Sequence, residues 1–357
     1  MKVRQEPRTT AASIPAQAVR IPLNVLFGLS DNHTARVRVV DQGRRLEYSL
    51  PGTANIIPFL HKERFVLNVI YLQSGNPVPV NLNAGPLLNH IADADMCSLA
   101  LKLAEQIAEK SARPCFNHPV AVARTSRDSV SRLLAGIPGL TVPQTLRITA
   151  VAAAEVPKAI EEAGLSYPVL LRIPGSHGGA NLEKVDTPAR AFEVAGWPRS
   201  GEALYVTKFY DFASPDGHYR KFRVVVVGDD IFLRTCIVGG KWLLGRGRRT
   251  ANSEQEERAR LASFETELGP ALKPVFSEMR RRLGLDYFGV DCNIDEKGHV
   301  LLFEANACMN ILRNNFPSPN IWEKPIARIT NAVERLLAAP STWYQPGAAA
   351  KSLQATV

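Results

Sequence analysis

The chain has 357 residues, which is more than one simple hydrophobic core usually organises and suits two or three subdomains. Apolar residues make up 45% of it and charged residues 22%, the balance of an ordinary globular protein. The formal net charge of +9 favours anionic partners, such as nucleotides, phosphates, acidic peptides or nucleic acid, without choosing among them.

Composition also excludes several classes of protein. No apolar run reaches the roughly 18 residues that cross a bilayer, and the opening residues, MKVRQEPRTT, lack the apolar stretch of a signal peptide. We therefore expect a cytoplasmic protein with no membrane partner. The five cysteines have no CxxC spacing, which favours reduced, buried thiols. The absence of zinc-finger spacing and of an RNA-recognition motif disfavours nucleic acid as a partner.

The first part of the chain predicts a tail and a small domain. Residues 1–19 are polar, rich in alanine and aperiodic, which is typical of a flexible tail. Strand-like segments at residues 22–27 and 65–71 precede a helical pattern at 97–109. Because strands and a helix alternate here, residues 20–115 predict a small α/β domain.

The second unit, residues 116–204, contains a loop rich in glycine. A helix is expected from Asp128 and Ser129, and a buried strand at residues 168–173 leads directly into Pro-Gly-Ser-His-Gly-Gly-Ala-Asn at 174–181. Three glycines within five residues let the backbone turn sharply and bring N–H groups close to an anion. The loop is also compatible with an ordinary turn, and it matches neither the Walker nor the dinucleotide-binding pattern.

The third unit, residues 205–342, opens near a strand at 203–210 and continues into a basic strand. Period-two alternation along residues 219–227 places Lys221 and Arg223 on one face, with Arg220 beside them in the chain. Because these basic residues enter a strongly apolar strand, they indicate a desolvated anion, although an exposed basic cluster stays open. The run Gly-Arg-Gly-Arg-Arg at 245–249 suits either a mobile loop near substrate or a solvated loop.

Helices are expected at residues 254–268, 273–283 and 326–338, and a disordered tail at 343–357. Between the helices lies a predicted hairpin, with strands at 287–294 and 299–303 around a turn-like segment at 295–298. A two-residue loop at Lys297 and Gly298 would place Asp291 directly opposite Glu304, with Asn306 on the same face.

Two carboxylates placed opposite each other repel unless a cation lies between them. Together with the Asn306 carboxamide they form a hard, all-oxygen site of the kind that binds Mg²⁺. A solvated hairpin edge is the alternative. Apolar residues precede both Asp291 and Glu304, and a carboxylate at the end of a buried strand usually serves a purpose there.

The order of these segments resembles the ATP-grasp superfamily over roughly residues 117–313. The most specific part is Asp291 with Glu304-Ala-Asn306, and the segment Asp-Gly-His-Tyr-Arg-Lys-Phe-Arg at 216–223 looks like a signature of uncharacterised ATP-grasp proteins. The resemblance implies an α+β fold in which two lobes, residues 116–204 and 205–342, hold ATP between them. Residues 20–115 look like the small domain that precedes these lobes.

The resemblance also implies roles for individual residues. Those expected to hold two Mg²⁺ ions against the triphosphate are Asp291, Glu304 and Asn306. Those expected to contact phosphates are Arg127, Arg172, Ser176, His177, Gly178 and Gly179. The interlobe segment expected to read adenine is Thr207, Lys208 and Phe209, and the group expected to stabilise an acyl phosphate is Arg223, Lys221 and Arg220. There are departures: Ser129 stands where the family has a lysine, for which Arg127 or Arg124 substitutes, and Lys208 replaces an acidic residue.

The function that the resemblance implies is an ADP-forming, ATP-dependent carboxylate–amine ligase. A substrate acid would be activated as an acyl phosphate and joined to an amine, which requires no protein nucleophile. Three alternatives stay open: a kinase that phosphorylates a small molecule, a nucleotide-binding protein without turnover, and a ligase whose acceptor is a peptide. A homodimer is the common default for such an enzyme.

Overall fold

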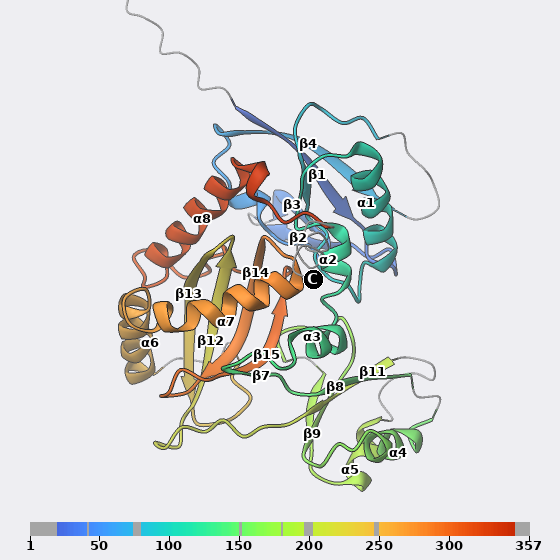
Figure 1. Cartoon of the computed structure of the whole chain (residues 1–357), viewed down its shortest axis with the longest axis vertical. Coiled ribbons are helices and arrows are strands. Elements are labelled where there is room, and N and C mark those ends of the chain that lie inside the picture. The colour runs from blue at the N-terminus through green and yellow to red at the C-terminus, as the bar shows by residue number, and fades with distance from the viewer. Residues whose placement is uncertain are drawn as a thin grey trace, which may run out of the picture.

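The structure is a computed structural model, and it describes residues 20–40, 43–73, 80–149, 152–179, 181–195, 203–245 and 250–346. The predicted tail at 1–19, the arginines at 246–249 and the end of the chain from 347 lie outside the described residues. Three sheets with their helices form the body of the molecule (Figure 1). No helix in the described ranges is long and apolar enough to cross a membrane.

The N-terminal part is a parallel sheet in the strand order β4-β1-β5-β6. Its strands are β1 (Ile21–Gly28), β4 (Phe65–Leu72), β5 (Leu87–Asn89) and β6 (Cys115–Phe116), and its helices are α1 (Ser98–Ser111) and α2 (Pro119–Ala123). The strands and the helix predicted here are confirmed. A hairpin of β2 (Arg36–Val40) and β3 (Arg45–Ser49) and a short 3-10 helix, η2 (Ile57–Phe59), lie between β1 and β4.

The central part is an antiparallel sheet in the order β10-β9-β11-β8. It consists of β8 (Thr145–Thr149), β9 (Val169–Arg172), β10 (Leu182–Val185) and β11 (Ala203–Lys208), with α4 (Glu155–Glu162) and α5 (Pro188–Ala195). Val156 and Ile160 of α4 pack with Val169 and Leu171 of β9 in a hydrophobic core separate from the main one. The expected domain boundary between 204 and 205 falls inside β11, whose hydrogen bonds belong to this central sheet.

The C-terminal part is a five-stranded sheet in the order β13-β12-β14-β15-β7. Its strands are β7 (Leu140–Thr141), β12 (Tyr219–Val227), β13 (Asp230–Gly239), β14 (Tyr287–Ile294) and β15 (Val300–Asn306). Its helices are α3 (Arg127–Leu134), α6 (Ala251–Ser263), α7 (Leu268–Leu283) and α8 (Glu323–Leu337), followed by the 3-10 helix η3 (Pro340–Thr342). The side chains of β14 are buried along its whole length, which explains its nearly unbroken apolar sequence.

The hairpin confirms the predicted pairing of Asp291 with Glu304, although its turn differs from the prediction. The Asp295 N–H donates to the His299 carbonyl at 3.0 Å, so the loop is three residues long, 296–298, rather than two. The register then shifts by one residue between Asp291 and Cys292, because Phe303 is an extra residue in β15. The two differences cancel, and the carboxylates face each other.

Residues 343–346, which were expected in the disordered tail, are packed against the protein. The Trp343 side chain is only 3% exposed, and its ring meets Phe116 edge-on with centroids 5.4 Å apart. The Tyr344 N–H donates to an Asp286 carboxylate oxygen at 2.7 Å. The start of the predicted tail at 343 is therefore wrong, because Trp343 supplies apolar surface that the core buries.

Asn117 joins the N-terminal sheet to the C-terminal sheet. Its backbone φ is 48°, in the left-handed region that Asn tolerates better than most residues. Its side chain accepts from the N–H groups of Asp286 and Tyr287 at 2.8 and 2.9 Å and donates to the Tyr287 carbonyl at 2.7 Å. The Asp286 carboxylate accepts the Asn117 N–H at 2.9 Å in return.

We predict that Asn117→Ala lowers the free energy of unfolding by about 2–4 kcal/mol, because three buried backbone groups lose their partner. The matched control is Asn55→Ala. Asn55 has a similar backbone φ of 52°, but its side chain makes a single long contact, 3.4 Å, to the Thr53 carbonyl. Urea unfolding of both variants measures the difference, and equal losses would show that backbone conformation rather than hydrogen bonding matters.

The buried carboxyl of Asp286 should make the free energy of unfolding depend on pH. Burial raises the pKa of its carboxyl from 3.8 to about 6. The folded state therefore binds this proton more tightly than the unfolded chain, so the contribution of Asp286 to stability falls as pH rises from about 4 to about 6, by up to about 3 kcal/mol. Urea unfolding at several pH values should show this loss in wild type relative to Asp286→Asn. Parallel pH curves would contradict it.

Candidate active site

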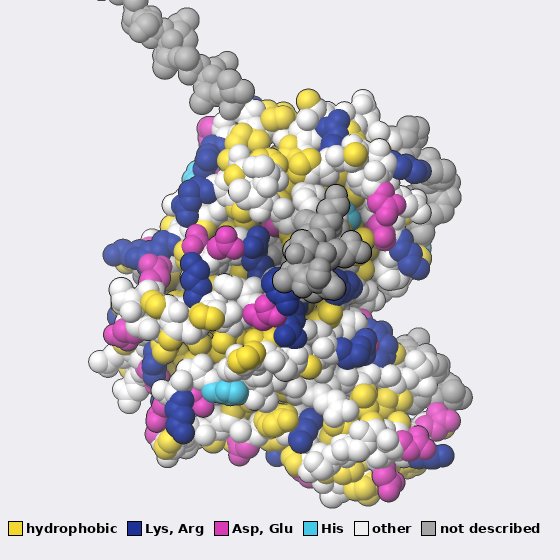
Figure 2. Space-filling view, viewed as in Figure 1, with side chains coloured by type: hydrophobic (Ala, Val, Ile, Leu, Met, Phe, Trp, Pro, Cys, Tyr) yellow, Lys and Arg dark blue, Asp and Glu magenta, His cyan; other side chains and the backbone are white. Residues whose placement is uncertain are grey.

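A cleft opens where the three parts of the chain meet. It encloses about 650 Å³, part of it open to solvent, and residues from all three parts line it. The N-terminal part contributes Asp93 and Asp95, the central part contributes Ser176 and His177, and β15 contributes Glu304. Lys and Arg side chains gather along the middle of the visible face, between the upper and lower parts of the molecule (Figure 2).

The facing carboxylates Asp291 and Glu304 are each paired with basic side chains. Arg223 of β12 holds Asp291 in two hydrogen bonds, of 2.6 and 2.8 Å, and Lys221 Nζ lies 3.6 Å away. Arg127 at the start of α3 lies 2.6 Å from Glu304, and Asn306 Nδ2 donates to the same carboxylate at 2.8 Å. The structure thus brings the predicted metal residues together with two of the predicted basic residues of β12.

The glycine-rich loop carries His177 into the cleft. Gly175, Gly178 and Gly179 have φ values of +71°, +67° and +81°, which explains why glycine occupies these positions. The loop begins with a turn in which the Ser176 N–H donates to the Ile173 carbonyl at 3.3 Å, directly after β9 ends. This geometry confirms that the loop turns sharply, and contact of its residues with phosphate stays a prediction.

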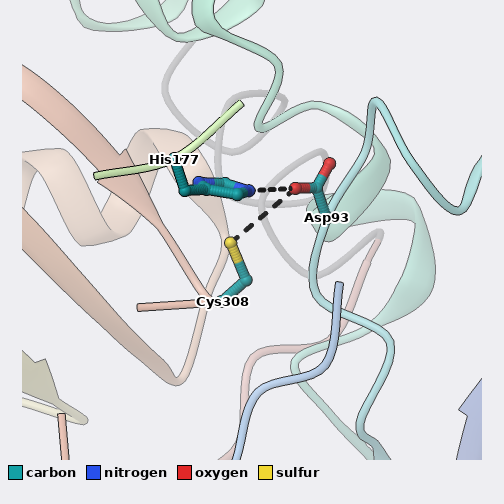
Figure 3. Close-up of side chains that lie close together, drawn as sticks. All are labelled: Asp93, His177 and Cys308. Atoms are coloured by element: carbon teal, nitrogen blue, oxygen red, sulfur yellow. Dashed lines mark hydrogen bonds and ion pairs between the residues drawn. The ribbon is translucent and has the colours of Figure 1, made fainter. Parts of the chain in front are cut away.

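His177 lies between two carboxylates from different parts of the chain, Asp93 and Glu304. Figure 3 shows its contact with Asp93. Its Nε2 atom is 2.7 Å from Asp93 Oδ2, and its Nδ1 atom is 3.7 Å from Glu304 Oε1. The hydrogen bond with Asp93, and then the nearby Glu304 carboxylate, raise the pKa of His177 to about 9. The imidazole is therefore a cation at neutral pH.

Arg172 is a buried guanidinium at the end of β9. Its side chain is buried, and its Nε atom has no hydrogen-bond partner among the described residues. Burial, followed by repulsion from Arg127, lowers its pKa to about 10, while Glu304 and Asp291 act in the opposite direction. A buried guanidinium that lacks a hydrogen-bond partner lowers the stability of the folded protein unless an anion compensates its charge.

The charges around the cleft favour an anion. Six basic groups lie together, namely Arg127, Arg147, Arg172, His177, Lys221 and Arg223, against the four carboxylates Asp93, Asp95, Asp291 and Glu304. Six positive and four negative charges leave an excess of two positive charges. An anion that carries several negative charges, such as a polyphosphate, suits this excess.

The interlobe segment reaches the cleft through Thr207, whose hydroxyl lies 3.0 Å from that of Thr145. The N–H groups of Lys208 and Phe209 donate to the carbonyls of Gln144 and Pro168, at 2.9 and 3.2 Å. Since these two N–H groups are already bonded, they are not the ones that would read adenine in this conformation. A role for the segment in adenine binding stays a prediction, with Thr207 as its best-placed member.

Arg220 is not brought into the site. Its guanidinium lies 2.6 Å from Asp216 and 2.7 Å from Glu256 of α6. Alternation along β12 turns Arg220 away from the face that carries Lys221 and Arg223. In this structure Arg220 ties the strand and its preceding loop to α6, and its catalytic role stays a prediction.

Sequence reasoning missed the two acidic residues that follow β5. Asp93 meets His177, and Asp95 accepts the Tyr205 hydroxyl at 2.8 Å and pairs with Arg147 of β8. A signal was present, because ligands of open α/β sheets bind beyond the carboxyl ends of parallel strands. The Ala-Asp-Ala-Asp run at 92–95 follows such an end.

The residues present fit Mg²⁺ by the chemistry of their donors. Asp291, Glu304 and Asn306 offer oxygen atoms on one face of a hairpin, and both carboxylate side chains are largely buried. The Asn306 Oδ1 atom accepts the Cys308 N–H at 3.0 Å, which fixes the carboxamide. These three residues would hold the ion, as hard oxygen ligands do.

Comparison with known proteins shows the fold. No family model and no curated protein matches the chain. Among solved structures, the D-Ala:D-Ser ligase VanG from Enterococcus faecalis aligns with 89% of this chain and 100% of its own, with a TM-score of 0.52 and 14% identity. The D-alanine-D-alanine ligase from Coxiella burnetii aligns with 89% of this chain and 94% of its own, with a TM-score of 0.54 and 14% identity.

A RimK-domain ATP-grasp protein from Sphaerobacter thermophilus is also similar, with a TM-score of 0.49 and 15% identity over 88% of this chain and 98% of its own. The strand order, the facing lobes and the two ligase structures define the class: the chain has the α+β ATP-grasp fold. This confirms the α+β fold predicted from the sequence, and membership of the superfamily stays a prediction.

We predict that Arg172→Met has opposite effects on stability and binding. Removing an uncompensated buried charge should raise the free energy of unfolding by about 1–3 kcal/mol, while affinity for an ATP analogue should fall at least roughly tenfold. Urea unfolding and calorimetric titration measure the two effects. The control is Arg132→Met on an exposed part of α3, which should change neither. A less stable variant with unchanged affinity would contradict the assignment.

Proposed function

We propose that this protein is an ATP-dependent ligase that activates a carboxylate as an acyl phosphate and joins it to an amine. The observation that carries the proposal is the excess of positive charge around Asp291 and Glu304, with the buried Arg172, whose Nε atom has no hydrogen-bond partner among the described residues, at its edge. The ATP-grasp fold supports it, since VanG and the Coxiella burnetii protein, two solved structures similar to this chain, are named as ligases.

The first step would be phosphoryl transfer to the substrate acid. Asp291, Glu304 and Asn306 would hold Mg²⁺, which would supply neutralisation of the negative charge that develops during transfer. Arg127, Arg172 and His177 would hold the triphosphate from the side of α3 and the glycine-rich loop. Arg223 and Lys221, which already lie against Asp291, would stabilise the oxygens of the transferred phosphoryl group.

The second step would be attack of the amine on the acyl phosphate, which releases phosphate and forms an amide. No protein nucleophile takes part. Cys308 is the cysteine nearest the site, and burial raises its pKa well above the usual value, so its thiol stays protonated. The other four cysteines are buried, as expected for reduced thiols in a core.

A kinase with the same fold differs in one measurable respect. It would leave the phosphoryl group on its product, whereas a ligase releases inorganic phosphate in step with amide formation. A ligase with a peptide acceptor would release phosphate in the same way and would require an acidic macromolecule in the assay. Screening acids and amines for phosphate release therefore separates kinase from ligase.

We predict that Glu304→Gln and Asp291→Asn abolish Mg²⁺-dependent binding of a non-hydrolysable ATP analogue. Each variant removes one negative charge from the predicted metal ligands while keeping the size of the side chain. Isothermal titration with and without Mg²⁺ measures the loss. Glu256→Gln is the matched control, because Glu256 is a carboxylate paired with Arg220 away from the cleft.

Two results would count against this proposal. Binding that is equally strong in both variants would reject the metal assignment, and absence of binding in wild type would reject the nucleotide site. Retained binding in Glu256→Gln, together with normal unfolding of all three variants, would show that the effect belongs to the site rather than to the fold.

A further inference from the structure

Three side chains with different donor atoms converge beside the proposed nucleotide site (Figure 3). Asp93 follows β5 in the N-terminal part, His177 belongs to the glycine-rich loop of the central part, and Cys308 follows β15 in the C-terminal part. Their donor atoms all lie within 4.8 Å of one another. Each of the three parts of the chain thus supplies one member of the cluster.

The donor set is one carboxylate oxygen, one imidazole nitrogen and one sulfur. Zn²⁺ accepts all three, whereas Mg²⁺ requires oxygen. We propose that Asp93, His177 and Cys308 form a zinc-binding site, distinct from the oxygen site of Asp291, Glu304 and Asn306. This proposal rests on the geometry of the cluster and does not require the protein to be a ligase.

The distances suit a metal after small movements. Zn²⁺ bonds of about 2.0–2.3 Å in a tetrahedron place neighbouring donor atoms roughly 3.2–3.7 Å apart. His177 Nε2 lies 2.7 Å from Asp93 Oδ2, and Cys308 Sγ lies 4.0 Å from the same oxygen. The first distance must open and the second must close by about half an ångström. Rotation of the His177 and Cys308 side chains can supply both changes.

The surroundings orient the donors toward one point. The N–H groups of Asp95 and Met96 bond Asp93 Oδ1 at 2.8 and 3.0 Å, which leaves Oδ2 turned toward His177 and Cys308. The other ring nitrogen of His177 faces Glu304 Oε1 at 3.7 Å. A carboxylate at the second nitrogen is the usual partner of a zinc-bound histidine.

The fourth position is left for a water molecule, which would complete four-coordination. Binding would displace the thiol proton and the imidazolium proton, since zinc takes thiolate and neutral imidazole as ligands. The metal would then replace the Asp93–His177 ion pair as the link between the glycine-rich loop and the N-terminal part.

One consequence rests on the proposed function. His177 is among the basic groups expected to meet the triphosphate, and a metal on its Nε2 atom would hold the ring against Asp93. Zinc and nucleotide should therefore weaken each other's binding by the same factor, as linkage requires. The bound metal would hold the glycine-rich loop of the central part against Asp93 of the N-terminal part and Cys308 of the C-terminal part.

The test is titration of the purified full chain with Co²⁺, followed by competition with Zn²⁺. A cobalt–thiolate bond gives a charge-transfer band in the near ultraviolet, and tetrahedral cobalt gives visible bands. We expect both in wild type. Cys308→Ala should lose the near-ultraviolet band, and Asp93→Asn and His177→Gln should weaken binding by roughly 100-fold or more, beyond the 10–100-fold typical of outer-sphere partners.

The control is His299→Gln, at an exposed histidine on the hairpin turn that bonds Thr141 instead of the cluster. It should leave the spectrum unchanged. Binding without a thiolate band, or a band that survives in Cys308→Ala, would mean adventitious metal only and would overturn the proposal. Since no nucleotide is present, the outcome is independent of the ATP-analogue titration: a thiolate band without analogue binding would keep the zinc site and reject the proposed function.

Discussion

The pairing of Asp291 with Glu304 is the constraint on which the site depends. Two carboxylates on adjacent strands of a buried hairpin are unstable unless positive charge compensates them. The fold supplies that charge from separate elements: Arg223 comes from β12, and Arg127 comes from α3. The glycine-rich loop adds His177. The lobes are therefore held together at the site by charge as well as by packing.

The same arrangement explains why the site has an excess of cations. Arg223 and Arg127 would suffice to neutralise the two carboxylates. Arg172 and Lys221 add further positive charge, and Arg172 is buried where burial lowers its pKa. This excess of buried positive charge opposes folding in the absence of a ligand. Such a cost is typical of a binding site rather than of a structural ion-pair network.

The sequence allowed the fold and much of the site to be predicted, because these features rest on local patterns. The strands of the hairpin, the turn at Gly178 and Gly179 and the basic face of β12 follow from periodicity and glycine chemistry. The position of the hairpin turn could not be read, since a longer loop and a compensating bulge give the same facing pair. The pairing of Arg220 could not be read either, because its partner Glu256 lies on a helix 36 residues further along the chain.

The partners of Asp93 and Asp95 could not be predicted for a related reason, although the position of both residues after β5 was a signal for a site. Their partners, His177, Arg147 and Tyr205, lie 52 to 110 residues away in the chain. Only the packing of the N-terminal part against the central sheet brings these groups together, and no local pattern records it. Since both acidic residues belong to the small N-terminal domain, any change in how that domain sits must alter His177 and Arg147 together. The N-terminal domain is thus linked to the site by charge.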